Sequence, residues 1–247
     1  MIRIKNLYKT YGTKKVLEDI NLEIPSGEIT VIIGPSGCGK STLLRMLIGL
    51  QKPTSGEIWV DGQEISGMTE GELNEVRKKM GMVFQYSALF DFLSVGENVA
   101  FGLRQHSACS EEDIGKAVRR RLKMVGLEGS EDIMPAELSG GMKKRVSLAR
   151  AIASNPSVVL YDEPTAGLDP IMSSVIDRLI VGFRERLQIT SVVVTHNMDS
   201  AFKLADRVAM ISEGRIIEVG TPEEIKASKN PVVQQFIHGW LSPTLQK

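Results

Sequence analysis

The stretch Gly34-Pro-Ser-Gly-Cys-Gly-Lys-Ser-Thr42 decides the fold of this 247-residue chain. It matches the pattern G-x-x-x-x-G-K-[ST] of a phosphate-binding P-loop. An apolar run typical of a strand, Ile29–Ile33, precedes it, and a run typical of a helix, Thr42–Ile48, follows it. Glycines let backbone N–H groups turn inward around an anion, and the following helix directs the positive end of its dipole to the same place. The sequence therefore predicts a nucleoside triphosphate site.

Each residue of this stretch is a candidate for contact with a nucleotide. Lys40 can reach the β- and γ-phosphates of ATP, and the Ser41 hydroxyl can bind Mg²⁺. The expected cofactors are therefore ATP and Mg²⁺. The nucleotide-binding candidates in the loop are Gly34, Pro35, Ser36, Gly37, Cys38, Gly39, Lys40, Ser41 and Thr42.

Composition narrows the class of protein. The chain has 30 basic and 30 acidic residues, so no overall basic field draws it to nucleic acid. Its two cysteines, Cys38 and Cys109, offer no disulfide framework and suit a reduced, cytosolic setting. No apolar run approaches the ~20 residues that span a bilayer, and residues 1–5 are typical of a strand rather than a signal peptide. We expect a soluble chain without a nucleic-acid partner.

Apolar strand patterns alternate with helical patterns along the chain, which predicts an α/β fold with a parallel sheet. Residues 1–33 are typical of short strands, and Asp61-Gly62 predicts a hairpin turn. Residues 87–155 have helical patterns and interrupt the predicted core. Further helices and strands are expected at residues 110–126, 139–154, 157–161, 171–187, 191–195 and 207–219, with capping boxes at Ser94–Glu97 and Thr221–Glu224.

Two acids follow the apolar run Val158–Tyr161. Asp162, at the tip of this predicted strand, can hold Mg²⁺ directly or through water. Glu163 can position and deprotonate the attacking water. The alternative is a strand-end turn with solvated acids, and the P-loop in the same chain favours the first interpretation.

A second candidate anion site lies in Leu138-Ser-Gly-Gly-Met142. Ser139, Gly140 and Gly141 would begin a helix whose backbone N–H groups could bind an anion. The alternative is an ordinary serine cap beside flexible glycines.

Together these motifs resemble ATP-binding cassette (ABC) ATPase domains, over residues 2 to about 227. The resemblance implies a single domain with a RecA-like P-loop NTPase core and parallel sheet, an N-terminal antiparallel β subdomain and an inserted α-helical subdomain. The expected parts are the core with its β subdomain at 1–86 and 156–228, the helical subdomain at 87–155 and a C-terminal helical tail at 229–247. The six motifs are the P-loop Gly34–Thr42, the Q-loop residue Gln85, the signature Leu138–Met142, the Walker B acids Asp162 and Glu163, the D-loop Ala166–Pro170 and the switch histidine His196.

The resemblance also implies residue roles, each with a structural alternative. Gln85 would contact Mg²⁺ and the water, or be a polar loop residue. His196 would contact the γ-phosphate, or be structural. Tyr11 would stack on adenine, or be a strand-edge core aromatic, and Asp169 would shape the dimer's nucleotide site, or cap a helix. The implied catalytic residues are Glu163, His196, Gln85 and Lys40, and the implied metal ligands are Ser41, Gln85 and Asp162.

In this family two copies pair head to tail, so each ATP would lie between one P-loop and the Ser139–Gly141 segment of the other copy. ATP would join the copies, and hydrolysis would release them. Because the chain has one cassette and no predicted span, the implied partners are transmembrane permease subunits, at the cytoplasmic face of the inner (plasma) membrane. The apolar segment Tyr86–Val95 would receive those subunits or belong to the helical core.

Finer features are similar to the Mla- and Mce-type phospholipid-transport ATPases. The resemblance implies an ATPase that drives phospholipid transport, with an MCE-type substrate-binding protein as a further partner. One alternative is the ATPase of an importer for a polar solute such as an amino acid. A soluble cassette in translation or DNA repair is less consistent, since those usually carry two cassettes or long coiled-coil insertions. The features are Ser87–Phe90, Glu97–Arg104, Met142–Arg145 and Val232–Gly239.

Two further segments have open interpretations. The tail has a wide apolar stripe that would pack on its own core or on a partner subunit. The basic cluster Arg119–Lys123 would be a solvated helix face, or contact anionic lipid headgroups. The stripe consists of Val232, Val233, Phe236, Ile237, Trp240 and Leu241.

Overall fold

The chain folds into two compact units, which a computed structural model describes over residues 1–106 and 109–241. Unit 1 consists of Met1–Leu73 together with the chain from Thr190 onward, and unit 2 consists of Asn74–Ile189. The helix α2 (Glu70–Arg77) contains the first division between them. The predicted site residues are distributed over both units.

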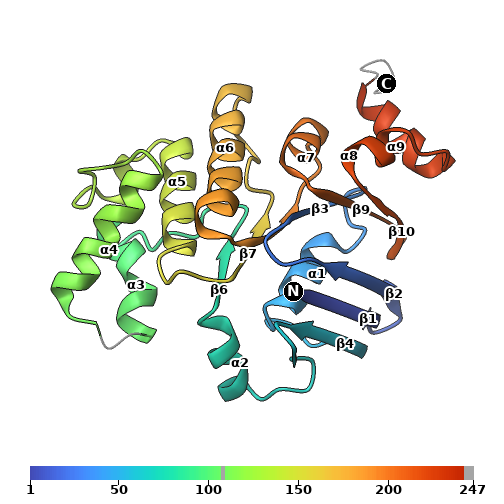
Figure 1. The fold of residues 1–247 in the computed structure, drawn as a ribbon, viewed down its shortest axis with the longest axis horizontal. Helices are drawn as coiled ribbons and strands as arrows, with labels where there is room; N and C mark the ends of the chain where they lie inside the picture. Colours follow the sequence, from blue (N-terminus) through green and yellow to red (C-terminus); the bar gives the residue numbers. More distant parts are fainter. Residues whose placement is uncertain (107–108, 242–247) are drawn as a thin grey trace. The chain divides into compact units, whose positions relative to one another are not determined.

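An antiparallel sheet of four strands begins unit 1, in the order β2-β1-β4-β5. Figure 1 labels β2, β1 and β4 of this sheet. Successive side chains of a strand point to opposite faces, and Ile2, Ile4 and Leu7 of β1 are buried. The turn residues Asp61 and Gly62 have φ angles of 47° and 83°, so the Asp-Gly hairpin turn is confirmed. The strands are β1 (Ile2–Tyr11), β2 (Lys14–Ile24), β4 (Ser55–Val60) and β5 (Gln63–Glu64).

A second set of strands in unit 1 carries the P-loop. Strand β3 lies between β8 and β9 and runs parallel to both, and β10 is antiparallel to β9. Every residue of β3 and β8 is buried, as continuous apolar strands covered on both faces should be. Helix α1 packs against β8, and α7 packs against β3. The elements are β3 (Ile29–Ile33), α1 (Lys40–Leu47), β8 (Thr190–Val194), α7 (Met198–Leu204), β9 (Arg207–Ser212) and β10 (Arg215–Gly220).

The end of the chain forms α8 (Pro222–Lys226) and α9 (Pro231–Leu241), which contact each other. In α9, Val233 and Ile237 are buried, so this part of the apolar stripe packs on unit 1 itself. The side chains of Trp240 and Leu241, and residues 242–247 of the predicted tail, lie outside the described residues. Over the described ranges, no helix has both the length and the apolar character needed to cross a bilayer.

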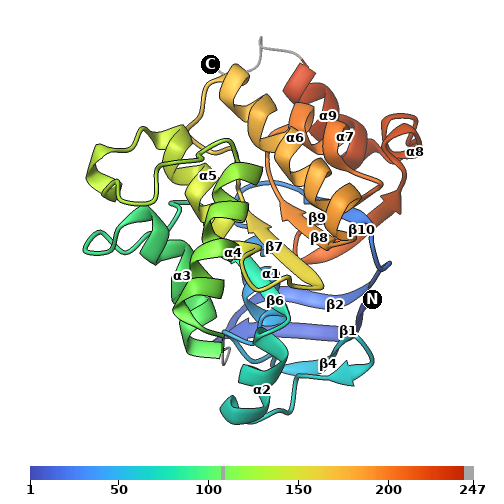
Figure 2. The ribbon, with the colours of Figure 1, turned by 60° about the vertical axis from the view of Figure 1, so that its left-hand side comes forward.

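Unit 2 combines a pair of parallel strands with helices. Strand β6 pairs with β7, and α5 packs against both β6 and α6. Helices α3, α4 and α5 contact one another and lie side by side in both ribbon views (Figures 1 and 2). The elements are β6 (Met80–Val83), α3 (Val95–His106), α4 (Glu111–Met124), the 3-10 turn Pro135–Glu137, α5 (Gly140–Ala151), β7 (Val158–Asp162) and α6 (Pro170–Leu187).

The α/β class and the strand-P-loop-helix order are confirmed. Both predicted capping boxes form, because Ser94 and Glu97 exchange hydrogen bonds of 2.7 and 3.3 Å, as Thr221 and Glu224 do at 2.7 and 3.2 Å. The division into units does not follow the predicted subdomain limits, since unit 2 holds β6, β7 and α6 beside the helices of residues 87–155. Those limits therefore stay a prediction.

Gly81 marks a close approach between β6 and the end of α5, and it supplies a test of this packing. A Cβ at Gly81 would lie 2.2 Å from the carbonyl oxygen of Ala151, so Gly81→Ala should lower the free energy of unfolding by about 1–3 kcal/mol. Gly102→Ala is the control, because nothing lies within 4 Å of its Cβ position on α3 and alanine favours a helix by about 0.5–1 kcal/mol. Urea unfolding measures both variants, and equal stabilities for the two would contradict the packing.

Candidate nucleotide-binding and hydrolysis site

Glycine is sterically required at two positions of the P-loop. Gly34 and Gly39 have φ angles of 149° and 105°. A Cβ on Gly34 would lie 2.1 Å from the carbonyl oxygen of Ile211, and one on Gly39 would lie 2.6 Å from Leu17 Cδ2. Gly39 is also the N-cap of α1, so no side-chain oxygen caps the first turn of that helix. This geometry suits a backbone cradle for phosphate at a helix N-terminus.

The ammonium of Lys40 lies at the start of the loop. It donates hydrogen bonds to the carbonyl oxygens of Gly34 and Pro35, at 2.7 and 2.9 Å, and the residue is buried. Burial raises the pKa of the neighbouring Cys38 thiol, against the opposing effect of Lys40, so Cys38 stays neutral at neutral pH. The loop therefore holds one buried positive charge where a bound phosphate would meet it.

His196 lies near the P-loop within unit 1. It follows β8, and the next turn is fixed because Asn197 donates from its N–H to Thr195 Oγ1 at 3.0 Å and accepts from the Ser200 N–H at 3.1 Å. One pocket is lined by His196 together with Gly34, Pro35, Ser36, Met210, Val232, Gln235, Phe236 and Gly239. The structure thus brings the predicted γ-phosphate contact to the predicted phosphate loop.

Tyr11 ends β1 with 46% of its surface exposed, which argues against the strand-edge core alternative. Its hydroxyl donates to Gln51 Oε1 at 2.6 Å, and the Lys9 ammonium lies 4.8 Å from the ring centroid. The ring is therefore fixed at its hydroxyl end and accessible to a planar base.

The remaining predicted site residues belong to unit 2. Asp162 ends β7, and both Asp162 and Glu163 are buried, so they are not the solvated acids of the alternative interpretation. Ser139 caps α5 by accepting from the Met142 N–H at 3.3 Å, and Ser139 and Gly140 are exposed. Asp169 caps α6 by accepting from the Met172 N–H at 2.9 Å. Both residues therefore cap helices, and their roles toward a nucleotide stay predictions.

Sequence reasoning missed Lys144, which connects two of these residues. Its ammonium donates hydrogen bonds to the main-chain carbonyl oxygens of Gln85 and, at 3.4 Å, Glu163. Burial lowers the pKa of Lys144, while the charges of Glu163 and Asp162 act in the opposite direction. A signal was available in the helical spacing, because Lys144 shares the buried face of α5 with Gly141 and Leu148.

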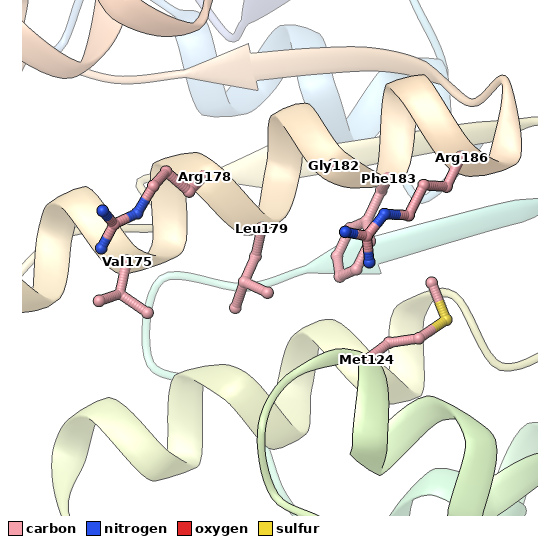
Figure 3. Close-up of a pocket in the computed structure, with 7 residues that line it drawn as sticks. All are labelled: Met124, Val175, Arg178, Leu179, Gly182, Phe183 and Arg186. Atoms are coloured by element: carbon pink, nitrogen blue, oxygen red, sulfur yellow. The ribbon is translucent and has the colours of Figure 1, made fainter.

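A different pocket of unit 2 lies beside α6 (Figure 3). Its wall is one face of α6, with Met124 of α4 opposite, and it contains none of the predicted nucleotide-site residues. It therefore lies outside the candidate site. The lining residues are Met124, Val175, Arg178, Leu179, Gly182, Phe183 and Arg186.

A parallel strand, a glycine-dependent loop with a buried lysine, and a helix beginning at that lysine define a P-loop nucleoside triphosphatase. The family model described as "ABC transporter" matches residues 17–166. The chain belongs to the ABC transporter family, and within it to the ATP-hydrolysing subunits. The resemblance predicted from the motifs is thereby confirmed.

Relatives within the family have different transport functions in their names. The chain is 44% identical to the intermembrane phospholipid transport system ATP-binding protein MlaF of Haemophilus influenzae, over 97% of this chain and 90% of that protein. It is also 44% identical to the methionine import ATP-binding protein MetN of Carboxydothermus hydrogenoformans, over 99% of this chain and 74% of that protein. A dimeric structure of the ATP-binding cassette MJ0796 with ADP and Pi superposes with a TM-score of 0.83 at 36% identity, covering 90% of this chain and 99% of that one.

Lys40 provides a direct test of the loop. Lys40→Ala removes the buried charge, and a charge-assisted hydrogen bond of about 1.5–3 kcal/mol corresponds to an increase of roughly 10- to 150-fold in the Kd for ATP. Calorimetric titration with ATP measures it. Lys203→Ala, an exposed lysine of α7 in the same unit, is the control and should leave the Kd unchanged. Unchanged ATP affinity in Lys40→Ala would refute the assignment.

Proposed function

We propose that this chain is the ATPase subunit of a phospholipid transporter, in which two copies close on two ATP molecules and act on separate membrane subunits. The ATPase assignment rests on the geometry of the P-loop and on His196, which lines the same pocket as Gly34–Ser36 of that loop. The lipid part rests on the likeness to a phospholipid-transport subunit over 90% of that protein's length, against 74% for the methionine importer.

Two segments of the chain are proposed to bind ATP. The backbone N–H groups of Gly34–Thr42 and the Lys40 ammonium hold the phosphates, while the Tyr11 ring stacks on adenine. The exposed Ser139–Gly140 end of α5 binds the γ-phosphate of the ATP held by the other copy. This division explains why one chain has two anion-binding helix ends.

Hydrolysis needs a base and neutralisation of the developing charge. Glu163 positions the attacking water and accepts its proton, and His196 contacts the γ-phosphate. Ser41, Gln85 and Asp162 offer a hydroxyl, an amide and a carboxylate oxygen, the ligands that Mg²⁺ prefers. Bound there, Mg²⁺ would neutralise phosphate charge.

Membrane coupling is assigned to the aromatic-rich segment Tyr86–Val95. Tyr86 and Phe92 are 86% and 77% exposed, which is unusual for large apolar side chains on a monomer surface. The Phe90 ring packs beside that of Phe92, at 5.8 Å between centroids, and beside that of Phe101 of α3, at 4.7 Å. A rigid, exposed aromatic surface suits a docking helix of a membrane subunit.

Two interactions hold the aromatic segment in place. Asn98 is fully buried and bonds both the N–H and the carbonyl of Phe90, at 2.8 and 3.1 Å. Arg150 donates to the carbonyls of Ser87 and Ala88, at 2.8 and 2.6 Å. We assign the subunit to the cytoplasmic face of the inner membrane as a peripheral protein, with an MCE-type substrate-binding protein as a further partner of the complex.

Glu163→Gln separates ATP binding from hydrolysis. The amide cannot accept the proton of the attacking water, so kcat should fall by about 10²- to 10⁴-fold while the affinity for ATP is kept. Phosphate release and ATP titration measure the two quantities on the same sample. Full ATPase activity in this variant would exclude Glu163 as the base.

Lipid analysis of the intact complex tests the transport assignment. The tagged full chain, purified from its native membranes in mild detergent, should retain membrane subunits and bound phospholipid. Phe92→Asp should lose both, because a charge replaces the exposed ring, whereas Leu50→Asp alters a 54% exposed apolar residue elsewhere and should keep both. Retention of membrane subunits without phospholipid, with ATPase activity stimulated by an amino acid, would support the polar-solute importer instead.

A further inference from the structure

We propose that Lys144 is a positioning residue for hydrolysis, which holds the backbone of Gln85 and Glu163 in one fixed relation and so sets the place of the Glu163 carboxylate. The proposal rests on the proposed role of Glu163 as the base. In this role Lys144 of α5 acts through Glu163 and contacts neither the nucleotide nor the attacking water.

The first support is the place of the Lys144 ammonium. The residue is 5% exposed, and its Nζ donates to the carbonyl oxygens of Gln85 and Glu163. These acceptors lie 59 residues before and 19 residues after Lys144 in the chain. Burying an ammonium costs free energy unless the group is hydrogen-bonded, so loss of either contact would be unfavourable. The Lys144 side chain therefore links the backbone of Gln85 to that of Glu163 through hydrogen bonds.

The second support is the backbone of Glu163. Its φ angle is 49°, a left-handed conformation that is strained for a non-glycine residue. The Glu163 carbonyl accepts two hydrogen bonds, from Lys144 Nζ and from the Ala166 N–H at 3.1 Å. These bonds help to hold Glu163 in this conformation, directly after the end of β7. Loss of the Lys144 bond would let this residue relax toward a more ordinary backbone conformation.

The third support is the helix on which Lys144 lies. Lys144 lies on α5, whose exposed N-terminal end, Ser139–Gly140, is proposed to bind the ATP held by the other copy. A displacement of α5 on binding that ATP would be carried by Lys144 to Gln85 and Glu163. The base in one copy would then be placed correctly only when its α5 is engaged, which links the two halves of the dimer.

A matched control exists on the same helix. Arg145 is also a cation that donates to two main-chain carbonyls, those of Val125 and Gly126, at 3.3 and 3.1 Å. Neither carbonyl belongs to a predicted site residue. Lys144→Met and Arg145→Met therefore remove the same kind of interaction, but only the first should affect the place of Glu163.

The experiment measures kcat, KM for ATP and thermal unfolding in the assembled transporter. Lys144→Met should lower kcat by about 10- to 100-fold with KM changed by less than about twofold, because a misplaced base slows chemistry without loosening the phosphate loop. Arg145→Met should lower the unfolding temperature but keep kcat. Lys144→Arg, which keeps N–H donors, should recover kcat to within about threefold. Where Lys144→Met does not fold, Lys144→Gln replaces it, with an intermediate loss expected.

A double variant shows whether Lys144 acts through Glu163. In the Glu163→Gln background, Lys144→Met should change the remaining single-turnover rate by less than about twofold, since no base is left to misplace. Equal kcat losses in Lys144→Met and Arg145→Met, or additive losses in the double variant, would overturn the proposal. An active Glu163→Gln variant would instead refute the proposed base, whereas an inactive one beside a fully active Lys144→Met would refute only the role of Lys144.

Discussion

The approach of the Ile211 carbonyl to Gly34 is the constraint on which the nucleotide loop depends. A Cβ would lie 2.1 Å from that oxygen, so β9 can pair with β3 and the loop can leave β3 only if glycine stands there. The same turn directs the chain into α1 at Lys40 and leaves the lysine bonded across the start of the loop. Phosphate binding thus follows from a packing requirement of the sheet, because the conformation that avoids the clash is also the one that turns the backbone inward.

The parts of the fold that the sequence predicted are those with local signals. The P-loop, the Asp-Gly hairpin and the capping boxes depend on residues a few positions apart, and each formed as expected. The short strand β6 was not predicted, because four residues cannot establish a periodicity and Gly81 weakens a strand pattern. Helices α2 and α7 were also not predicted, because with 8 and 7 residues each is too short to show a clear helical periodicity of apolar residues.

Only part of the candidate site could be predicted from the sequence. Motifs identified the groups proposed to touch ATP, but not the side chains that hold those groups. A lysine in a helix is normally solvated, and only the carbonyls of Gln85 and Glu163, far from Lys144 in the chain, explain its burial. Helical spacing can indicate that Lys144 lies on the buried face of α5, but a single sequence does not identify the distant carbonyls that it binds, because those are set by tertiary contacts.

At two places in unit 2, a cationic side chain of α5 donates hydrogen bonds to the carbonyls of residues with a left-handed backbone conformation. Ser87 and Ala88 have φ angles of 62° and 48°, and their carbonyls accept from Arg150, just as the carbonyl of Glu163 at φ 49° accepts from Lys144. Ser87 and Ala88 lie in the segment assigned to membrane coupling, and Glu163 is the proposed base. Because side chains of one helix hold both segments, a movement of α5 would act on both. The proposed base and the surface proposed for the membrane subunit are therefore both bonded to side chains of α5, which gives a short physical route between them.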